Sequence, residues 1–400
     1  MNALKRHILY LLFAVSALVT ARGQSDTTVW LVTFYPGSEV YELEGHTALR
    51  VQVPGADLGV SWGLFDFNAP NFVYRFVKGE TDYMMGVIPW QYIRQEYIAS
   101  GRRIVERRID LDGSQKRRLL ELLQTNALPE NRTYRYNYVL DNCATRPLRM
   151  LELAAGDSII LGSAGDTLTA QNTFRKAMRH YHRNYPWYQL GIDLALGSGI
   201  DKPLGNRELS FAPATLDRQL DGATVNGRPL VSATVVSNDV DPGNGILPPT
   251  PWWLTPRTVF GAVFVLMLML TVHDWRRRRP SRWADCLWFA LTGLAGCLLT
   301  FLIFISTHYA TSPNWLYLWL NPLGLVIAAA IWIKKAEKLV LWLQIANFAI
   351  VLTGLVLWPL TGQSTSAALI LPVAVTLMRS GLYPGLALIK KADRRPSGKH

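Results

Sequence analysis

The sequence predicts a mixed α and β domain outside the membrane, followed by an all-α membrane domain of five transmembrane helices. Its 400 residues exceed the length of one ordinary domain. Half of them are hydrophobic and only 18% are charged, against about 25% in a typical soluble protein. The apolar residues gather near the N-terminus and beyond residue 250, while the part between them is rich in strand-like segments. These three observations carry the prediction.

The net charge of +12 is unevenly distributed along the chain. Residues 251–400 carry 15 Lys or Arg and 4 Asp or Glu, whereas residues 24–250 carry 23 and 25. The basic residues therefore stand at the ends of apolar segments, where membrane topology requires them. This distribution argues against a nucleic-acid partner.

Residues 1–23 have the pattern of a secretory signal peptide. Lys5 and Arg6 precede an apolar run at 8–21, and small residues stand near Ala21 and Gly23. An N-terminal membrane anchor is the alternative, but this run of 14 residues is shorter than the roughly 20 that a span needs. We therefore expect the part that follows to be exported.

Residues 24–203 are predicted to form the exported domain. Segments rich in β-branched and aromatic residues predict strands at 29–35, 47–53, 58–67 and 103–109. Ser114, followed by leucines at helical spacing, predicts a capped amphipathic helix. Residues 204–256 contain many Pro and Gly residues and are predicted to be a linker.

The pattern changes after Trp252 and Trp253, an aromatic pair suited to a membrane interface. Apolar runs long enough, or nearly so, to cross a bilayer follow at about 257–273, 283–305, 315–333, 339–360 and 366–389. The exported domain and these runs together explain the composition of the chain.

Basic residues occupy alternate loops of this membrane part. They follow the first, third and fifth runs: Arg276, Arg277, Arg278, Arg279, Arg282, Lys334, Lys335, Lys338, Lys390, Lys391, Arg394, Arg395 and Lys399. The loops at 308–314 and 361–366 carry no Lys or Arg. The positive-inside rule therefore places the basic loops and the tail at 390–400 in the cytoplasm, and residues 24–250 outside.

Three cysteines are present. Cys286 and Cys297 lie in one predicted span, 11 residues and so about 16 Å apart, which is too far for a disulfide. They are predicted to be packing residues. Cys143 has no partner cysteine in the exported domain, where a free thiol is hazardous. It is therefore either a buried inert residue or a reactive thiol.

The residues around Cys143 favour a reactive thiol. Asp141 and Asn142 are good N-caps, which would place Cys143 in the first turn of a helix. Backbone N–H groups and the helix dipole lower the pKa of a thiol there. A helix that begins at Cys143 loses a hydrogen bond at Pro147, so the helix begins either there or nearer Thr145.

A thiolate nucleophile needs a base, and His46 is the candidate. It heads the second predicted strand on the face opposite the apolar one, and it is either structural or the partner of Cys143 in a Cys–His dyad. Ser61 and Asp66 on the next strand are candidates to orient it. The other exported histidines are predicted to lie at the surface or in an interface: His180 and His182.

Four segments of the chain resemble the Lnb-type family of Bacteroidota. They are Gly45-His46-Thr47-Ala48-Leu49-Arg50, Trp62-Gly63-Leu64-Phe65-Asp66-Phe67, Tyr136-Asn137-Tyr138 with Asp141-Asn142-Cys143-Ala144-Thr145-Arg146, and Asn314-Trp315-Leu316-Tyr317-Leu318-Trp319-Leu320-Asn321-Pro322. The resemblance covers the exported domain and extends into the membrane part. It implies an α+β papain-like periplasmic domain, a permuted relative of NlpC hydrolases and of lecithin:retinol acyltransferase, in which the histidine precedes the cysteine. The order of His46 and Cys143 matches.

The resemblance implies a lipoprotein N-acyltransferase of the bacterial inner membrane. Cys143 would take a fatty acyl chain from a membrane phospholipid as a thioester, with His46 as base. The acceptor would be the α-amino group of a lipoprotein's N-terminal lipidated cysteine. Backbone N–H groups near Cys143 are the expected oxyanion donors, and the side chains considered for orienting or oxyanion roles are Asn142, Asp141, Ser61 and Asp66.

The loop at 308–314 is either a plain connection or part of a site at the membrane surface. Candidates for the substrate side of the site are Arg50, Arg146, His308, Asn314 and Asn321. The sequence contains no metal-ligand cluster, phosphate loop or nucleotide fingerprint, so no metal and no cofactor is expected.

Two alternative functions remain. A periplasmic Cys–His peptidoglycan peptidase or amidase would share the dyad, yet five spans are more than such an enzyme needs as an anchor. A non-enzymatic membrane receptor would account for the topology and leave Cys143 unexplained.

Overall fold

The computed structural model describes residues 27–66, 68–165, 173–239 and 249–393. The predicted signal peptide lies outside these residues. The chain divides into two compact units. Met1–Asn184 and Pro203–Pro248 form the first, here called the N-terminal unit, and Tyr185–Lys202 and Pro249–His400 form the second, the membrane unit.

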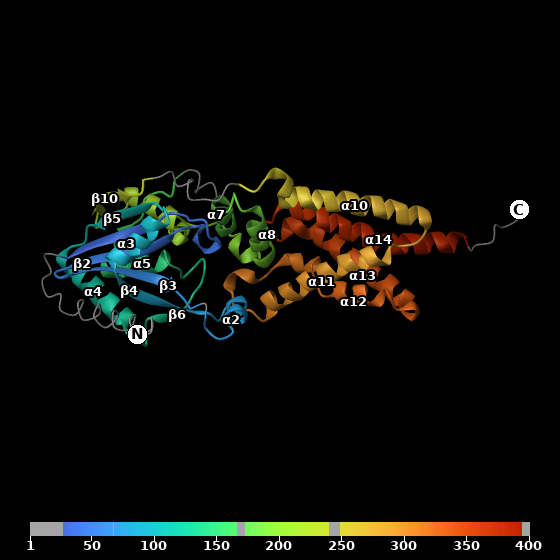
Figure 1. Cartoon of the computed structure of the whole chain (residues 1–400), viewed down its shortest axis with the longest axis horizontal. Coiled ribbons are helices and arrows are strands. Elements are labelled where there is room, and N and C mark those ends of the chain that lie inside the picture. Colours follow the sequence, from blue (N-terminus) through green and yellow to red (C-terminus); the bar gives the residue numbers. More distant parts are fainter. Residues whose placement is uncertain (1–26, 67, 166–172, 240–248, 394–400) are drawn as a thin grey trace, which may run out of the picture. The chain divides into compact units, whose positions relative to one another are not determined.

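The N-terminal unit is built on a seven-stranded antiparallel sheet with the order β10-β5-β1-β2-β3-β4-β6 (Figure 1). The strands are β1 Thr28–Phe34, β2 His46–Val53, β3 Ala56–Leu64, β4 Asp82–Pro89, β5 Ile104–Ile109, β6 Thr133–Arg135 and β10 Val231–Ser237. The four predicted strands are confirmed as β1, β2, β3 and β5. A small second sheet contains β7 Ile159–Ile160, β8 Thr224–Val225 and β9 Arg228–Pro229.

Helices cover both faces of the large sheet. The helices of the N-terminal unit are α2 Phe72–Lys78, α3 Trp90–Ala99, α4 Gly113–Ala127, α5 Thr145–Ala154, α7 Phe174–Tyr181 and α9 Pro213–Gln219. On one face Leu49 and Val51 of β2 share a buried cluster with Leu119 of α4 and Leu148 of α5. On the other face Ala48 belongs to a cluster with residues of α3. The central strands are therefore buried on both sides, which fixes the register of β2.

The cap of α4 differs from the prediction. Asp112, not Ser114, caps this helix: its Oδ1 accepts the N–H groups of Ser114 at 2.8 Å and Gln115 at 2.9 Å. The Gln115 side chain accepts the N–H of Asp112 at 3.0 Å, which completes a capping box. The Asp112 carboxylate, two residues before Ser114, therefore caps the helix.

Residues 204–256, predicted to be a linker, fold as part of the N-terminal unit over much of that range. Pro213 stands at the start of α9, where its missing N–H leaves no hydrogen bond unmade. β10 adds to the edge of the main sheet by pairing with β5. Among the described residues of this range, Pro213 marks a helix start and Gly227, with φ of +76°, marks a turn, and the linker prediction is corrected accordingly.

In the part of the membrane unit that the structure describes, four helices are long and apolar enough to cross a membrane. They are α10 Pro256–Arg277, α11 Arg282–Phe304, α13 Glu337–Leu357 and α14 Ile370–Asp393. The third predicted span, 315–333, is not one continuous helix: a 3-10 turn, η8 Trp315–Leu318, precedes the short helix α12 Leu323–Ala330. Asn321 and Pro322 interrupt it, and Asn321 Oδ1 accepts the N–H of Leu323 at 3.1 Å.

Glycines set the packing of α11 against α12. A Cβ added at Gly293 would collide with the backbone of Gly324 and Leu325, and one at Gly296 with the backbone of Asn321. Small residues allow helix backbones to approach closely in a membrane, where no hydrophobic effect drives association. The broken third span is therefore held against α11 by backbone contact.

A buried ionic cluster joins α10, α11 and α14. The Arg379 guanidinium is fully buried and donates to Asp285 at 2.5 Å and to Asp274 at 2.8 Å. Tyr383 donates its hydroxyl to Asp285 at 2.9 Å. Charged groups inside a membrane bundle are normally paired in this way. The cluster ties three helices that hydropathy alone does not connect.

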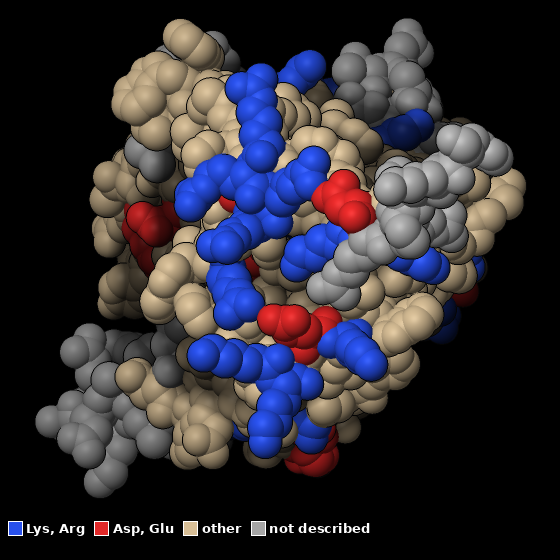
Figure 2. Space-filling view, turned by 90° about the vertical axis from the view of Figure 1, so that its right-hand side faces the viewer, with Lys and Arg blue, Asp and Glu red and all other residues tan. Residues whose placement is uncertain are grey.

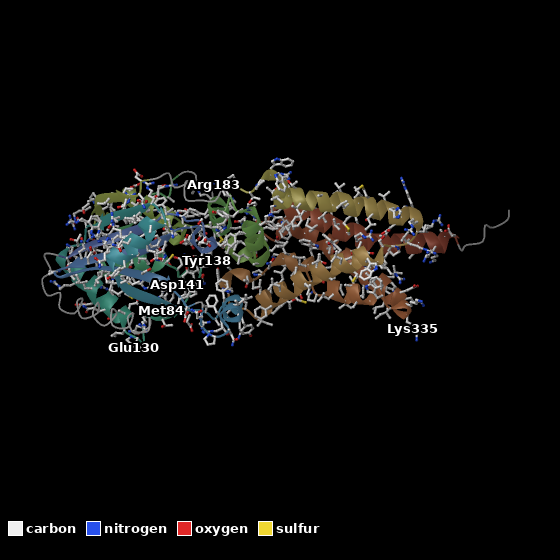
Figure 3. All side chains as sticks on the ribbon, in the orientation of Figure 1. Met84, Glu130, Tyr138, Asp141, Arg183 and Lys335 are labelled. Carbon is white, nitrogen blue, oxygen red and sulfur yellow. The ribbon has the colours of Figure 1, made fainter. Side chains whose placement is uncertain are left out.

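Basic residues gather at one end of the membrane unit. Figure 2 shows Lys and Arg side chains concentrated on that face, and Figure 3 labels Lys335 there. An ion pair between Arg282 and Glu337 at 3.8 Å places the start of α11 beside the start of α13. Arg278 and Asp393 likewise pair at the ends of α10 and α14. This charge asymmetry is the one that the loops predicted.

Candidate active site

Asn142 fixes the turn that carries Cys143. Its side-chain oxygen accepts the N–H groups of Ala144 at 2.9 Å and Thr145 at 3.0 Å. Its amide nitrogen donates to two backbone carbonyls, those of Tyr138 and Phe211, each at 2.8 Å. The helix α5 therefore begins at Thr145, and Cys143 lies in the turn just ahead of it. Because all four hydrogen bonds of the Asn142 side chain go to backbone groups of the protein, its role is to position the turn that carries the thiol.

We expect Asn142→Ala to destabilise the N-terminal unit by about 2–4 kcal/mol, since it removes the acceptor of two N–H groups and leaves the buried carbonyl of Phe211 and the half-buried carbonyl of Tyr138 without a donor. Thermal unfolding of the full-length protein in detergent measures this. Asn137→Ala is the matched control, because Asn137 Oδ1 also accepts two N–H groups, of Val139 and Leu140, but in a more exposed turn. Equal losses in the two variants would contradict the positioning role.

The Cys143 sulfur is half-buried and is surrounded by hydrogen-bond donors. It receives hydrogen bonds from the backbone of Thr47, from its own backbone and from the Tyr136 side chain. Burial outweighs these donors and raises the pKa of Cys143 to about 11, and the Glu44 carboxylate adds to the rise. Gly63 of β3 lies against the thiol: its φ is +93°, and a Cβ there would lie 3.7 Å from the Cβ of Cys143. At rest the group is a protonated thiol.

His46 is the first residue of β2, where it pairs with Phe34 across the sheet. Its Nε2 lies 2.7 Å from Ser61 Oγ. Burial, with a contribution from the nearby Arg102 guanidinium, lowers the pKa of His46 to about 4, so the ring is neutral at physiological pH. If Nε2–H donates to Ser61, Nδ1 is free to accept a proton, as a general base requires.

Ser61, rather than Asp66, is the orienting candidate that reaches His46. Asp66 is exposed, and its Oδ1 accepts the N–H of Asn68 at 2.8 Å. The backbone of Thr47, the next residue after His46, hydrogen-bonds the Cys143 sulfur, so His46 and Cys143 belong to one site. Within the described ranges no hydrogen bond joins them directly. Such bonds are often long in unliganded enzymes and tighten when substrate binds.

Glu44 is a member of the site that the sequence did not suggest. It is 9% exposed, and its Oε1 lies 3.5 Å from His182 Nε2. Burial raises the pKa of Glu44 to about 7, against a hydrogen bond from Tyr138 that lowers it. His182 is only 1% exposed, so of the two settings predicted for it, the surface or an interface, the surface is wrong. In the sequence, the only indication that Glu44 belongs to the site is its position two residues before His46.

We expect Glu44 and His46 to shift stability with pH in opposite directions. The raised pKa of Glu44 contributes stability that is full below about 4.5 and is lost as pH rises through 7. The lowered pKa of His46 contributes stability that is full above 6.5 and is lost as pH falls toward 4.

Glu44→Gln should therefore gain stability relative to the parent between pH 5 and pH 8, by up to about 3 kcal/mol. Thermal unfolding at pH 5, 6.5 and 8 measures the difference. The exposed Glu39→Gln is the control and should follow the parent. A Glu44→Gln profile parallel to that of the parent would contradict the buried, raised carboxyl.

Two predicted charged candidates lie beside Cys143 and are paired with each other. Arg146 forms two hydrogen bonds of 2.6 Å with Asp141, and its guanidinium lies 3.3 Å from the centre of the Tyr134 ring. Figure 3 labels Asp141, together with Tyr138, in the loop that precedes α5. This pair closes one side of the turn that carries the thiol.

Arg50 is engaged elsewhere in the sheet. It forms ion pairs with Asp57 and with Glu106, each at 2.6 Å, and lies over the Trp90 ring at 5.1 Å. These contacts account for its charge within the fold. Among the described residues no group of three or more His, Cys, Asp and Glu side chains is arranged to hold a metal ion.

The three remaining candidates belong to the membrane unit. Asn314 is buried, donates to the carbonyl of Leu194 at 2.8 Å and accepts from Gln363 at 3.0 Å. It thereby joins the loop at 308–314 to the end of α8 (Pro186–Ala195) and to the loop at 361–366. Asn321 Oδ1 accepts the N–H of Leu323 in the turn before α12, and the carbonyl of His308 accepts from Thr311. The two asparagines are therefore accounted for by loop structure.

Comparison with known families agrees with this division of the chain. The model of the Lnb N-terminal periplasmic domain matches residues 18–176, and that of the Lnb transmembrane domain matches residues 249–391. No curated protein and no solved structure matches the chain. Together with the long apolar helices, the matches describe an integral inner-membrane protein with a periplasmic N-terminal domain. The chain belongs to the Lnb family.

Proposed function

We propose that this protein is a lipoprotein N-acyltransferase that works through a thioester on Cys143. The family's domains fit a membrane enzyme that processes lipoproteins. The observation that carries the proposal is the setting of Cys143: a half-buried thiol that receives hydrogen bonds from Tyr136 and from the backbone of Thr47, the residue after a neutral His46. We include the papain-like relationship in the proposal, since the strand that begins at His46 precedes the helix that follows Cys143.

In the first half of the reaction the sulfur attacks the ester carbonyl carbon of a phospholipid. The thiol proton passes to Nδ1 of His46 as the C–S bond forms. The backbone N–H of Thr47 and the hydroxyl of Tyr136 already point toward the sulfur, so they are placed to stabilise the oxyanion. The bond to the glycerol oxygen then breaks, and the leaving alcohol takes the proton from His46.

In the second half an amine attacks the thioester. The α-amino group of the lipoprotein's N-terminal cysteine forms the amide, His46 takes the amine proton, and the C–S bond breaks to return the thiol. The partial burial of Cys143 favours this outcome, because a thioester shielded from water survives until the amine arrives. The net reaction exchanges one ester for one amide, and it needs no cofactor.

Expression in bacterial cells that lack their own lipoprotein N-acyltransferase tests the proposal. The parent protein should add one acyl chain to the N-terminal cysteine of lipoproteins, as peptide mass spectrometry would show. Cys143→Ser should add none, while Cys286→Ser and Cys297→Ser, in the membrane unit, should behave as the parent. Unmodified lipoproteins together with altered muropeptide cross-links would favour a peptidoglycan peptidase instead.

We also propose that five crossings, the third of them broken, leave the C-terminus in the cytoplasm. The basic residues at one end of the membrane unit support this orientation. A reporter that is active only in the periplasm should work when fused after Gly362 and fail after Lys338 or Lys391. Activity after Lys391 would contradict the odd number of crossings.

A further inference from the structure

A cavity of about 360 Å³ lies within the membrane unit. Its wall comes from η8, from the last turns of α13, from the loop at 361–366 and from the first turns of α14. None of the catalytic candidates discussed above lines it. The cavity and the thiol site are therefore formed by different residues.

The cavity has an apolar wall and a hydroxyl-bearing rim. Side chains such as Leu318, Val351 and Val373 form the wall, and three consecutive residues of the loop form the rim: Ser364, Thr365 and Ser366. None of the described residues that line it is charged. An apolar pocket with a small number of placed polar groups is typical of a ligand site.

The cavity lies at the end of the helices away from the basic residues. α13 begins beside Lys334 and Lys335 and reaches the cavity only with Val351 and later residues. α14 lines it with Ile370 and Val373 and ends at its own basic residues. The rim therefore belongs to the end that carries the uncharged loops.

The cavity also opens sideways. Leu355 and Ile370 line it and are 39% and 52% exposed, so its mouth lies on the surface that the helices present to lipid. An occupant can enter from the bilayer without passing through water.

The rim contains a polar atom without a partner. Thr365 Oγ1 is buried, and in the part of the chain that the structure describes it makes no hydrogen bond. A buried hydroxyl in this condition is destabilising unless something completes its hydrogen bonding. A ligand with an acceptor next to an apolar chain would supply the missing partner.

We propose that this cavity binds one acyl chain of a membrane glycerophospholipid, with the ester carbonyl of that chain hydrogen-bonded to Thr365. An acyl chain can pack against the uncharged wall, and its ester carbonyl can accept a hydrogen bond from the rim. The cavity volume is near the lower limit of small-molecule sites, which is consistent with a single chain. Phospholipid is the most concentrated molecule with this chemistry around the mouth, so mass action favours it. The claim that the bound lipid is the acyl donor rests on the proposed function. The claim that the cavity binds lipid does not.

Photo-crosslinking of the full-length protein tests the site. The probe is phosphatidylethanolamine with a diazirine on one acyl chain, in vesicles of the unlabelled lipid. Peptide mapping should find the label on residues that line the cavity. Val373→Trp, which fills it, should reduce that labelling about tenfold, whereas Val356→Trp on the lipid-facing side of α13, where Val356 is 67% exposed, should leave it unchanged. Equal labelling of both variants, or a label elsewhere, would overturn the proposal.

Thr365→Val separates binding from folding. It removes a hydroxyl that has no partner, so the thermal stability of the lipid-depleted protein should stay the same or rise. Cavity labelling should nevertheless fall by roughly fivefold, the value of one hydrogen bond. Unchanged labelling in this variant would exclude an ester at Thr365.

Two further measurements identify the occupant and its role. A synthetic diacylglyceryl lipopeptide shares the glycerol ester chemistry, and it should displace the probe no better than unlabelled phospholipid; stronger displacement would assign the cavity to the acceptor. Cys143→Ala should keep the cavity label. A cavity label with no adduct on Cys143 in the parent would leave the lipid site standing and reject the acyl-transfer function, whereas an adduct on Cys143 with no cavity label would reject the lipid site alone.

Discussion

Cys143→Ala and His46→Ala should each lower the rate of lipoprotein N-acylation by roughly 10³-fold or more, because each removes a group without which no thioester forms. Both variants should reach the membrane at normal levels, since neither side chain is a helix cap or an ion-pair partner. Initial rates with a fluorescent diacylglyceryl lipopeptide in phospholipid vesicles measure the effect.

The double variant Cys143→Ala with His46→Ala should be no slower than either single variant. A nucleophile and its base act as a unit, so removing the second loses nothing further. Ser61→Ala should have a smaller effect, about tenfold, since it frees the ring that the 2.7 Å contact orients. Retention of most activity in Cys143→Ala would reject thiol catalysis, and additive losses in the double variant would reject the dyad.

Arg379→Leu should be the most destabilising single substitution in the membrane unit, by about 3–5 kcal/mol. It leaves Asp274 and Asp285 buried side by side without their cation, and it removes the contact that joins α10, α11 and α14. Thermal unfolding in detergent, followed by size-exclusion chromatography, measures the loss. Arg277→Leu, an exposed basic residue at the end of α10, is the control and should change little.

A triple variant tests the physical reason. Neutralising both acids in the background of Arg379→Leu, with Asp274→Asn and Asp285→Asn, removes the unpaired charges and should recover a large part of the lost stability. If the triple variant were as unstable as the single one, packing and not charge would explain the loss. Stability equal to the parent in Arg379→Leu would contradict the cluster.

Local sequence pattern predicted the inner strands and the long helices. β1, β2, β3 and β5 alternate or run continuously apolar because helices cover the sheet, and such strands are visible in a sequence. β10 is as rich in β-branched residues, yet it follows a stretch of Pro, Gly and Asp residues that reads as a linker. Whether such a segment pairs depends on β5, which lies more than a hundred residues earlier in the chain.

Hydropathy found the membrane segments because lipid imposes the same requirement on each span. It could not show that Asn321 and Pro322 break the third segment, or that glycines at 293 and 296 bring α11 into backbone contact with it. The partners of Arg379 were equally hidden, since they lie in two other helices.

Some features of the candidate site could likewise be predicted from the sequence, and others could not. The order of His46 and Cys143, the cap residue Asn142 and the strand position of Ser61 are all readable along the chain. The burial of His182 and its contact with Glu44, and the hydrogen bond from Tyr136 to the thiol, depend on how distant segments pack. A polar stretch such as the one around His182 looks exposed in a sequence, and only the packed core shows that it is not.

Mass spectrometry of the Cys143 peptide tests the central claim most directly. Full-length protein is incubated with vesicles of a defined diacyl phospholipid in the absence of an amine acceptor, and then digested. The peptide should gain the mass of one acyl chain, hydroxylamine should remove that mass, and an equal amount of lysophospholipid should appear; Cys143→Ser should give neither product. Lysophospholipid without an acyl group on Cys143, or an adduct that persists in Cys143→Ser, would contradict a thioester on Cys143.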